Sequence, residues 1–134
     1  MGKSILMVDD DVDFTESVKA YLEARNYEVR TAHSGAEGKK EIDRVLPDII
    51  LLDIMMDTDT DGFNLAFELK NSESTRNIPI IILSGFTDHL KDKAKSFEFI
   101  MGKDWPATTY IKKPASLATI GTTVERLLAE GNAD

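Results

Sequence analysis

The sequence lacks cysteine altogether, although it is 134 residues long. Thiolate metal sites, thiol catalysis and disulfide bonds are therefore excluded. It also lacks an apolar stretch of roughly 18 residues, which a membrane-spanning helix would require. The first residues, MGKSILMVDD, contain too short an apolar segment for a secretory signal peptide. We therefore expect a cytoplasmic protein that does not enter a membrane.

Basic residues are scarce relative to acidic ones. The chain has 16 Lys and Arg against 24 Asp and Glu, which gives a formal net charge of -8. Nucleic acids and anionic lipid surfaces attract basic proteins, so neither is an expected partner. The hydrophobic fraction of 42% is ordinary for a globular protein, and the length suits one domain. We expect this domain to cover residues 1–131, with a short tail at 132–134.

Several short runs of branched apolar residues predict strands. They do not alternate with polar residues, as is typical of strands that are buried on both faces of a parallel sheet. The strong runs are SILMV at 4–8, DIILLD at 48–53 and IPIIILS at 78–84. Weaker candidates are YEVRTA at 27–32 and TYIKK at 109–113.

Helical patterns fill the intervals between these runs, because apolar residues recur there at spacings of three and four. We expect helices over 11–25, from Ser34 to just before Pro47, from Asp61 or Gly62 onward, around 90–100, and from Ser116 to Gly131. In the second helix, Ala36, Ile42 and Val45 should form the inner side. This succession of strand–helix units predicts an α/β fold, with a five-stranded parallel sheet, helices on both faces and right-handed crossovers.

Reactive side chains follow most of the predicted strands. Asp9, Asp10 and Asp11 follow the first strand, Asp53 ends the third, Ser84 ends the fourth, and Lys113 ends the fifth. The carboxyl ends of parallel strands meet at one edge of the sheet, where ligands bind. Two carboxylates about 5 Å apart would repel by roughly 3 kcal/mol at an effective dielectric of 20, so the cluster needs a cation. Oxygen ligands with open positions suit Mg²⁺, beside which a carboxylate could attack phosphorus.

Four motifs that occur in this order resemble the receiver domain of two-component response regulators, the module typified by the stand-alone chemotaxis regulator. They are MVDD at 7–10, LLDIMM at 51–56, IILSG at 81–85 and YIKKP at 110–114. The resemblance covers nearly the whole chain and implies a flavodoxin-like (βα)5 fold with three layers. No output domain follows the last predicted helix, so we expect a stand-alone receiver that signals through a partner in trans.

The resemblance also implies a role for each residue at the predicted edge. Asp53 would accept a phosphoryl group from a histidine kinase or a phosphotransfer protein. Asp9, Asp10 and Asp53 would hold Mg²⁺ together with the backbone carbonyl of Met55. The hydroxyl of Ser84 would bond a phosphoryl oxygen, and Lys113 would pair with the phosphate. Tyr110 would be the switch aromatic.

A receiver is a phosphoacceptor rather than an enzyme, so we expect only slow self-phosphorylation from small donors and slow hydrolysis. Phosphorylation in this family often works by homodimerisation, which leaves the oligomeric state open. The sequence also departs from the family, with Met56-Asp57 where Met-Pro is usual and with a longer segment containing Trp105-Pro106 before the last strand. These departures favour an alternative, a receiver-like adaptor that is not phosphorylated and acts through its altered fourth-helix and fifth-strand face.

Two other functions compete for the same part of the chain. The segment DTDTDG at Asp57–Gly62, with Glu68 after it, fits the spacing of an EF-hand calcium loop. An EF-hand requires a helix before its loop, whereas residues 47–56 have the pattern of a buried strand. The simpler interpretation is an acidic loop that leads into the helix at Asp61. A Mg²⁺-dependent phosphatase would need an Asp at the position of Met55.

The remaining polar residues have simple structural interpretations. Asp11 and Asp13 suit the first turn of the first helix, where carboxylates complement the helix dipole. Lys112 points away from the site and would be a surface residue. His33 and His89 have no carboxylate motif around them, so we interpret both as surface residues as well.

Overall fold

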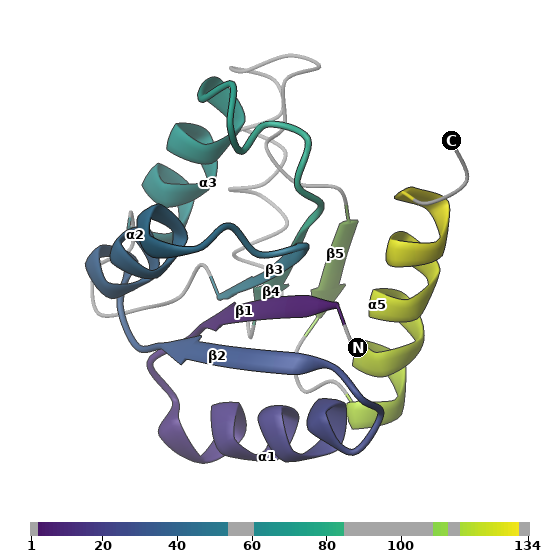
Figure 1. Cartoon of the computed structure of the whole chain (residues 1–134). Coiled ribbons are helices and arrows are strands. Elements are labelled where there is room, and N and C mark those ends of the chain that lie inside the picture. Colours follow the sequence, from purple (N-terminus) through teal and green to yellow (C-terminus); the bar gives the residue numbers. More distant parts are fainter. Residues whose placement is uncertain (1–2, 54–60, 85–108, 113–115, 132–134) are drawn as a thin grey trace.

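The computed structural model describes residues 3–53, 61–84, 109–112 and 116–131, in which strands and helices alternate along most of the chain (Figure 1). The strands are β1 (Ser4–Val8), β2 (Glu28–Ala32), β3 (Ile49–Asp53), β4 (Ile80–Ser84) and β5 (Thr109–Lys112). The helices are α1 (Val12–Glu23), α2 (Gly35–Arg44), α3 (Asp61–Asn71) and α5 (Leu117–Gly131). Each predicted strand is present, and its ends differ from the prediction by at most two residues.

Some predictions about the fold concern residues outside these ranges. Among them are the helix around 90–100, the segment that contains Trp105, and the tail at 132–134. None of the helices in the described ranges combines the length and the apolar character that a membrane span would need.

The strands form one five-stranded sheet in the order β2-β1-β3-β4-β5. Every neighbouring pair is parallel, and Val8 of β1 lies between Ala32 of β2 and Leu52 of β3. The order confirms the predicted parallel sheet. The direction in which the chain adds strands to the sheet changes at β1, because β2 lies on one side of this strand and β3 on the other. In open α/β sheets, ligands bind beyond the carboxyl ends of the strands at such a reversal.

Successive residues of β1, β3 and β4 enter opposite layers of the core. Leu6 and Val8 pack with residues of α2 and α3, whereas Ile5 and Met7 pack with residues of α1 and α5. Figure 1 shows the same division, with α2 and α3 on one face of the sheet and α1 and α5 on the other. Each fully buried Leu or Ile contributes about 1.5–3 kcal/mol of transfer free energy. Burial on both faces explains why the sequences of these three strands show no polar alternation.

The helices α1, α2 and α5 each begin at a side chain that binds a free backbone N–H group. Asp11 is the N-cap of α1, where its carboxylate accepts a hydrogen bond from Phe14 N at 3.1 Å. Asp11 therefore precedes the first turn, which corrects our interpretation, whereas Asp13 does lie in that turn. Ser34 and Ser116 cap α2 and α5 as predicted, since their hydroxyl oxygens accept from the N–H groups three residues later.

The inner side of α2 differs from the prediction. Ile42 is buried as expected, but Ala36 and Val45 are exposed. The helix instead turns Gly38 toward the sheet, where an added Cβ would lie only 2.9 Å from Cγ2 of Val8. Apolar spacing could not reveal this face, because a glycine has no side chain to mark it. The absence of that side chain is what lets α2 approach β1 so closely.

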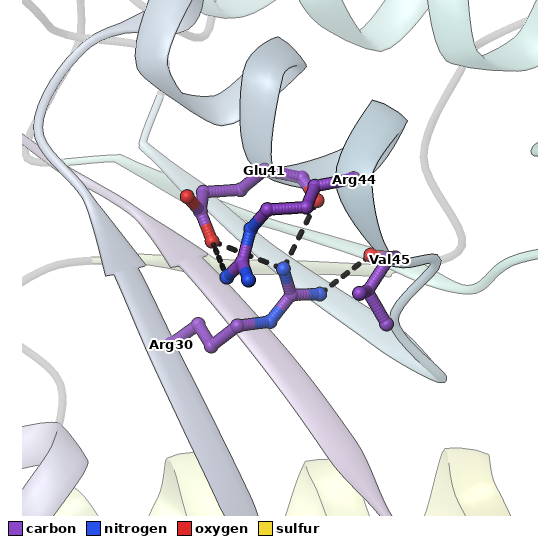
Figure 2. Close-up of polar contacts among 4 residues, drawn as sticks. All are labelled: Arg30, Glu41, Arg44 and Val45. Atoms are coloured by element: carbon purple, nitrogen blue, oxygen red, sulfur yellow. Dashed lines mark hydrogen bonds and ion pairs between the residues drawn. The ribbon is translucent and has the colours of Figure 1, made fainter.

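One guanidinium group joins the C-terminal end of α2 to the edge strand β2 (Figure 2). Arg30 Nη1 donates to the carbonyl and to Oε1 of Glu41, both at 3.0 Å, and Arg30 Nη2 donates to the Val45 carbonyl at 2.6 Å. Arg44 Nη2 lies 2.8 Å from the same Glu41 oxygen. The hydrogen bond from Arg44, with that from Arg30, lowers the pKa of Glu41 from its ordinary value of 4.5. The cluster holds the end of α2 against the sheet.

Replacing Gly38 with alanine should destabilise the protein by about 1 kcal/mol. Alanine favours a helix over glycine by about 1 kcal/mol. Its methyl group would, however, overpack the stiff and fully buried Val8 side chain, at a cost of about 1–3 kcal/mol. Urea unfolding measures the net change. In a Val8→Ala background the same replacement should be neutral or stabilising, and a loss of stability that persists there would contradict the overpacking explanation.

The lowered pKa of Glu41 predicts a stability contribution that depends on pH. A carboxyl whose pKa is lower in the folded state stabilises the fold at pH values above its pKa in the unfolded state, which is 4.5 for Glu41. This contribution is lost as the pH falls through the pKa of the folded state. Glu41→Gln should therefore unfold at lower urea than the unaltered protein at neutral pH, and the difference should shrink as the pH falls below 4.5. Glu16→Gln, at an exposed position of α1, is the control for loss of one carboxylate. A difference that stayed constant through the acidic range would contradict the role of Glu41.

Candidate functional site

Three carboxylates meet at the carboxyl edge of the sheet, where β1 and β3 end. Asp9 and Asp10 follow β1, and Asp53 is the last residue of β3. One carboxylate oxygen from each residue lies within 4.8 Å of the other two. Asp9 and Asp53 are buried, at 0% and 3% exposure, and Asp10 is partly exposed. The structure thus brings together the acidic residues that the sequence placed at this edge.

Backbone hydrogen bonds hold the acidic loop after β1. The N–H of Asp9 donates to the carbonyl of Ala32 at 3.0 Å, which continues the pairing of β1 with β2 by one residue. The N–H of Asp11 then donates to Oδ1 of Asp9 at 2.9 Å, in the pattern of an Asx-turn. Asp11 itself caps α1, so the positive end of the helix dipole lies next to the loop. These contacts hold the acidic loop at the edge of the sheet, beside the start of α1.

The donor set of this cluster fits Mg²⁺. Carboxylates this close repel one another by roughly 3 kcal/mol per pair at an effective dielectric of 20, so a cation would stabilise them. Mg²⁺ prefers oxygen ligands at about 2.1 Å in octahedral geometry, which places adjacent ligand oxygens about 3 Å apart and opposite ones about 4 Å apart. Oxygens that already lie within 4.8 Å of one another need little movement to share one ion. Asp9, Asp10 and Asp53 would hold the ion, and water would take open positions.

The other predicted site residues are described only in part. Ser84 ends β4 at the same edge of the sheet, beside Lys112 of β5. Tyr110 lies within β5, but its side chain and that of Ser84 are outside the described part of the structure. Lys113, which comes next after Lys112 in the chain, is also outside it, as is Met55. The backbone of Ser84 is where the sequence predicted it, and the roles of these residues remain predictions.

His33 is partly exposed, as expected of a surface residue, but it has a carboxylate neighbour, which corrects our expectation that none lies around it. It follows β2, and its Nδ1 lies 4.0 Å from Oε2 of Glu37. The same oxygen accepts from the backbone N–H of His33 at 2.6 Å, and Nε2 of His33 lies 3.5 Å from the Thr15 hydroxyl. The signal that was missed is the capping-box spacing of Ser34 and Glu37, which returns a carboxylate toward the residues before the helix.

The calcium-loop interpretation concerns residues that are mostly outside the described ranges, since these omit 54–60. The structure does describe both sides of the loop, because β3 ends at Asp53 and α3 begins at Asp61. A strand therefore precedes the loop, whereas an EF-hand requires a helix there. This arrangement favours the interpretation of Asp61 as the start of a helix. His89 is likewise outside the described residues.

The sequence model of the response regulator receiver domain family matches residues 5–125. Among curated relatives, the DNA-binding dual master transcriptional regulator RpaA of Synechocystis sp. is 32% identical over 92% of this chain. The response regulator PleD of Caulobacter vibrioides is 37% identical over 85% of it, and the phosphate regulon transcriptional regulatory protein PhoB of Pseudomonas aeruginosa is 37% identical over 87%. The matches cover 48%, 23% and 47% of these relatives, so the chain spans half of their length or less.

Solved structures share the fold. The signal receiver domain of a signal transduction histidine kinase from Syntrophus aciditrophicus has a TM-score of 0.84 and 28% identity, over 99% of this chain and 95% of its own. A putative response regulator from Chloroflexus aurantiacus J-10-fl has a TM-score of 0.80 and 30% identity, over 96% and 99%. A CheY-like receiver domain protein from Methanospirillum hungatei JF-1 has a TM-score of 0.80 and 27% identity, over 97% and 96%. These likenesses confirm the flavodoxin-like α/β fold.

We expect Mg²⁺ to bind the carboxylate cluster, and Asp10→Asn to weaken that binding about tenfold or more, because one of three charged ligands is lost. A titration with magnesium chloride, followed by the amide chemical shifts near Asp9, Asp10 and Asp53, gives the affinity. Asp13→Asn removes a carboxylate from the first turn of α1 and should leave the affinity unchanged. Equal affinities for the two variants would contradict the assignment of the site.

Proposed function

Because the chain belongs to the response regulator receiver domain family, we propose that it is a signalling protein that accepts a phosphoryl group on Asp53. Receiver domains take this group from histidine kinases or phosphotransfer proteins and bind Mg²⁺ at an acidic pocket. They are signalling phosphoacceptors rather than classical enzymes.

The observation that carries the proposal is the position of Asp53 in the carboxylate cluster. It ends the central strand β3, within 4.8 Å of carboxylate oxygens from Asp9 and Asp10. Oδ1 of Asp9 already accepts the hydrogen bond that shapes the loop after β1, and Asp10 lies on that same loop. Asp53 comes instead from a separate strand and faces the other two carboxylates. This division suits one nucleophile beside two residues that hold a cation.

In the transfer, a carboxylate oxygen of Asp53 forms a bond to phosphorus as the phosphorus–nitrogen bond of a protonated phosphohistidine breaks. The histidine ring leaves as neutral imidazole, because it keeps the proton on its other nitrogen. Asp9 and Asp10 would hold a Mg²⁺ ion, which would supply positive charge to the phosphoryl oxygens. The burial of Asp53 would limit the access of water to the aspartyl phosphate. Hydrolysis would later return the free carboxylate.

The remaining parts of the proposal come from the sequence. Ser84 would bond a phosphoryl oxygen, Lys113 would pair with the phosphate, and Tyr110 would respond to the movement of Ser84. The modified protein would signal by binding another protein in trans, either alone or as a homodimer. In the curated relatives further sequence accompanies the receiver, because the matches cover only 48% and 23% of their length.

Incubation with acetyl phosphate should add one phosphoryl group to the protein, as measured by intact-mass spectrometry. The addition should require Mg²⁺ and should be lost in Asp53→Asn, because the amide has no carboxylate oxygen to attack phosphorus. Asp13→Asn, which removes a carboxylate of α1 outside the cluster, should be labelled like the unaltered protein. Amide chemical shifts would show that Asp53→Asn remains folded.

Labelling that persists in Asp53→Asn would overturn the assignment of the phosphoacceptor. The adaptor alternative makes a different prediction, since it expects no adduct even with donor in large excess. It also expects no change in amide shifts on addition of beryllofluoride, which mimics the phosphoryl group. A negative result in both measurements would therefore replace the proposed function by the adaptor.

A further inference from the structure

A groove of about 870 Å³ lies between α2 and α3, away from the carboxylate cluster. Its lining includes residues from the last turns of both helices and from the segment after α3. Each helix crosses back between two parallel strands, so its C-terminal end lies at the amino edge of the sheet, opposite Asp53. Figure 1 shows the two helices side by side on one face of the sheet.

The floor of the groove is apolar, and one wall is an exposed leucine. Ile42 and Leu65 contribute buried side chains to the lining. Leu46 lines the same space and is 50% exposed, and its neighbour Val45 is 51% exposed. Only Val12 is a comparably exposed large apolar side chain in the described ranges, so two of the three gather at this end of α2. An apolar patch beside a hollow is typical of a surface that meets another molecule.

Hydrogen bonds hold both sides of the groove. Val45 leaves α2 in an extended conformation, and its carbonyl accepts from Arg30 at 2.6 Å (Figure 2). On the side of α3, the hydroxyl of the buried residue Thr75 donates to the carbonyl of Leu69 at 2.5 Å. The groove is therefore formed before a ligand binds, which lowers the entropic cost of binding.

The rim of the groove carries an excess of negative charge. Lys39 of α2 pairs with Glu68 of α3 at 3.3 Å. Asp43, one turn further along α2, makes no ion pair with any residue in the described part of the chain. The lining thus has two carboxylates and one ammonium group, in a chain with a formal net charge of -8. A cation on a ligand would complement Asp43.

We propose that this groove docks a segment of a partner protein in which a bulky apolar side chain stands beside a Lys or Arg. The apolar side chain would fill the space over Ile42 and against Leu46, and the cation would pair with Asp43. The acidic charge of the chain disfavours a second copy of itself in this role, as well as anionic lipid or nucleic acid. The inference goes beyond phosphoryl transfer and does not depend on it, because the groove and Asp53 lie at opposite edges of the sheet.

Two capped peptides of equal length test the proposal. One carries a single phenylalanine beside a single arginine, and the other has glutamate in place of the arginine. Amide chemical shifts of the full chain are followed as each peptide is added. The arginine peptide should shift amides of the last turns of α2 and α3, while those near Asp53 stay unchanged. The glutamate peptide should bind at least about twofold more weakly, because the cation is lost.

Paired variants locate the contacts. Asp43→Asn should weaken binding of the arginine peptide by about two- to fivefold, as expected for an exposed ion pair. The same variant should not weaken binding of the glutamate peptide. Leu46→Ala should weaken both peptides by about tenfold through lost apolar contact. The matched controls, Asp13→Asn and Val12→Ala on α1, remove an exposed carboxylate and an exposed apolar side chain and should change neither affinity.

Several results would overturn the proposal. One is the absence of shifts in the groove at millimolar peptide, and another is equal binding of the two peptides. Groove shifts that change with protein concentration alone would assign the surface to a second copy of the chain. The mass-spectrometric test of Asp53 is independent of these measurements, so either proposal can fail while the other stands.

Discussion

The functional part of the structure depends on the parallel pairing of β1 with β3. This pairing sets Val8 beside Leu52, so the residues that follow them, Asp9 and Asp53, reach the same edge together. The two residues are far apart in the chain, and the sheet is what brings them close. Both strands are buried by helices on both faces, so the apolar core resists any separation of the carboxylates.

The cluster concentrates negative charge where the rest of the fold is apolar, which costs stability unless that charge is compensated. The structure supplies part of the compensation through backbone groups. Asp9 accepts from the N–H of Asp11, and Asp11 begins a helix whose positive end lies beside the loop. What remains is an oxygen-rich site that favours a cation, and a cation is what a negatively charged phosphoryl group requires in order to approach Asp53.

The helix α2 contributes to both edges of the molecule through different residues. Near its start, Gly38 packs against Val8, the residue that precedes Asp9, so the close contact supports the strand that carries the acidic loop. At its end, Arg30 of β2 binds the Val45 carbonyl and keeps the exposed apolar residues in place (Figure 2). The edge that carries Asp9 is charged and suited to phosphoryl chemistry. The groove at the opposite edge has an apolar floor and one more carboxylate than ammonium groups, which suits the binding of a segment of a partner protein.

The sequence by itself determined the alternation of strands and helices, because buried strands and amphipathic helices have different apolar periods. It also determined that Asp9, Asp10 and Asp53 share an edge, since parallel strands all present their carboxyl ends there. Only the tertiary structure decided that Gly38 of α2 faces the sheet. The helix lies so close to β1 that a side chain at this position would contact Val8, and a pattern of hydrophobic residues does not reveal this. The cap at Asp11 and the contact of Glu37 with His33 are local features of helix starts, and the capping-box spacing in the sequence signals the second of them. Local patterns specify the elements, and the close approaches between elements depend on packing that no single segment encodes.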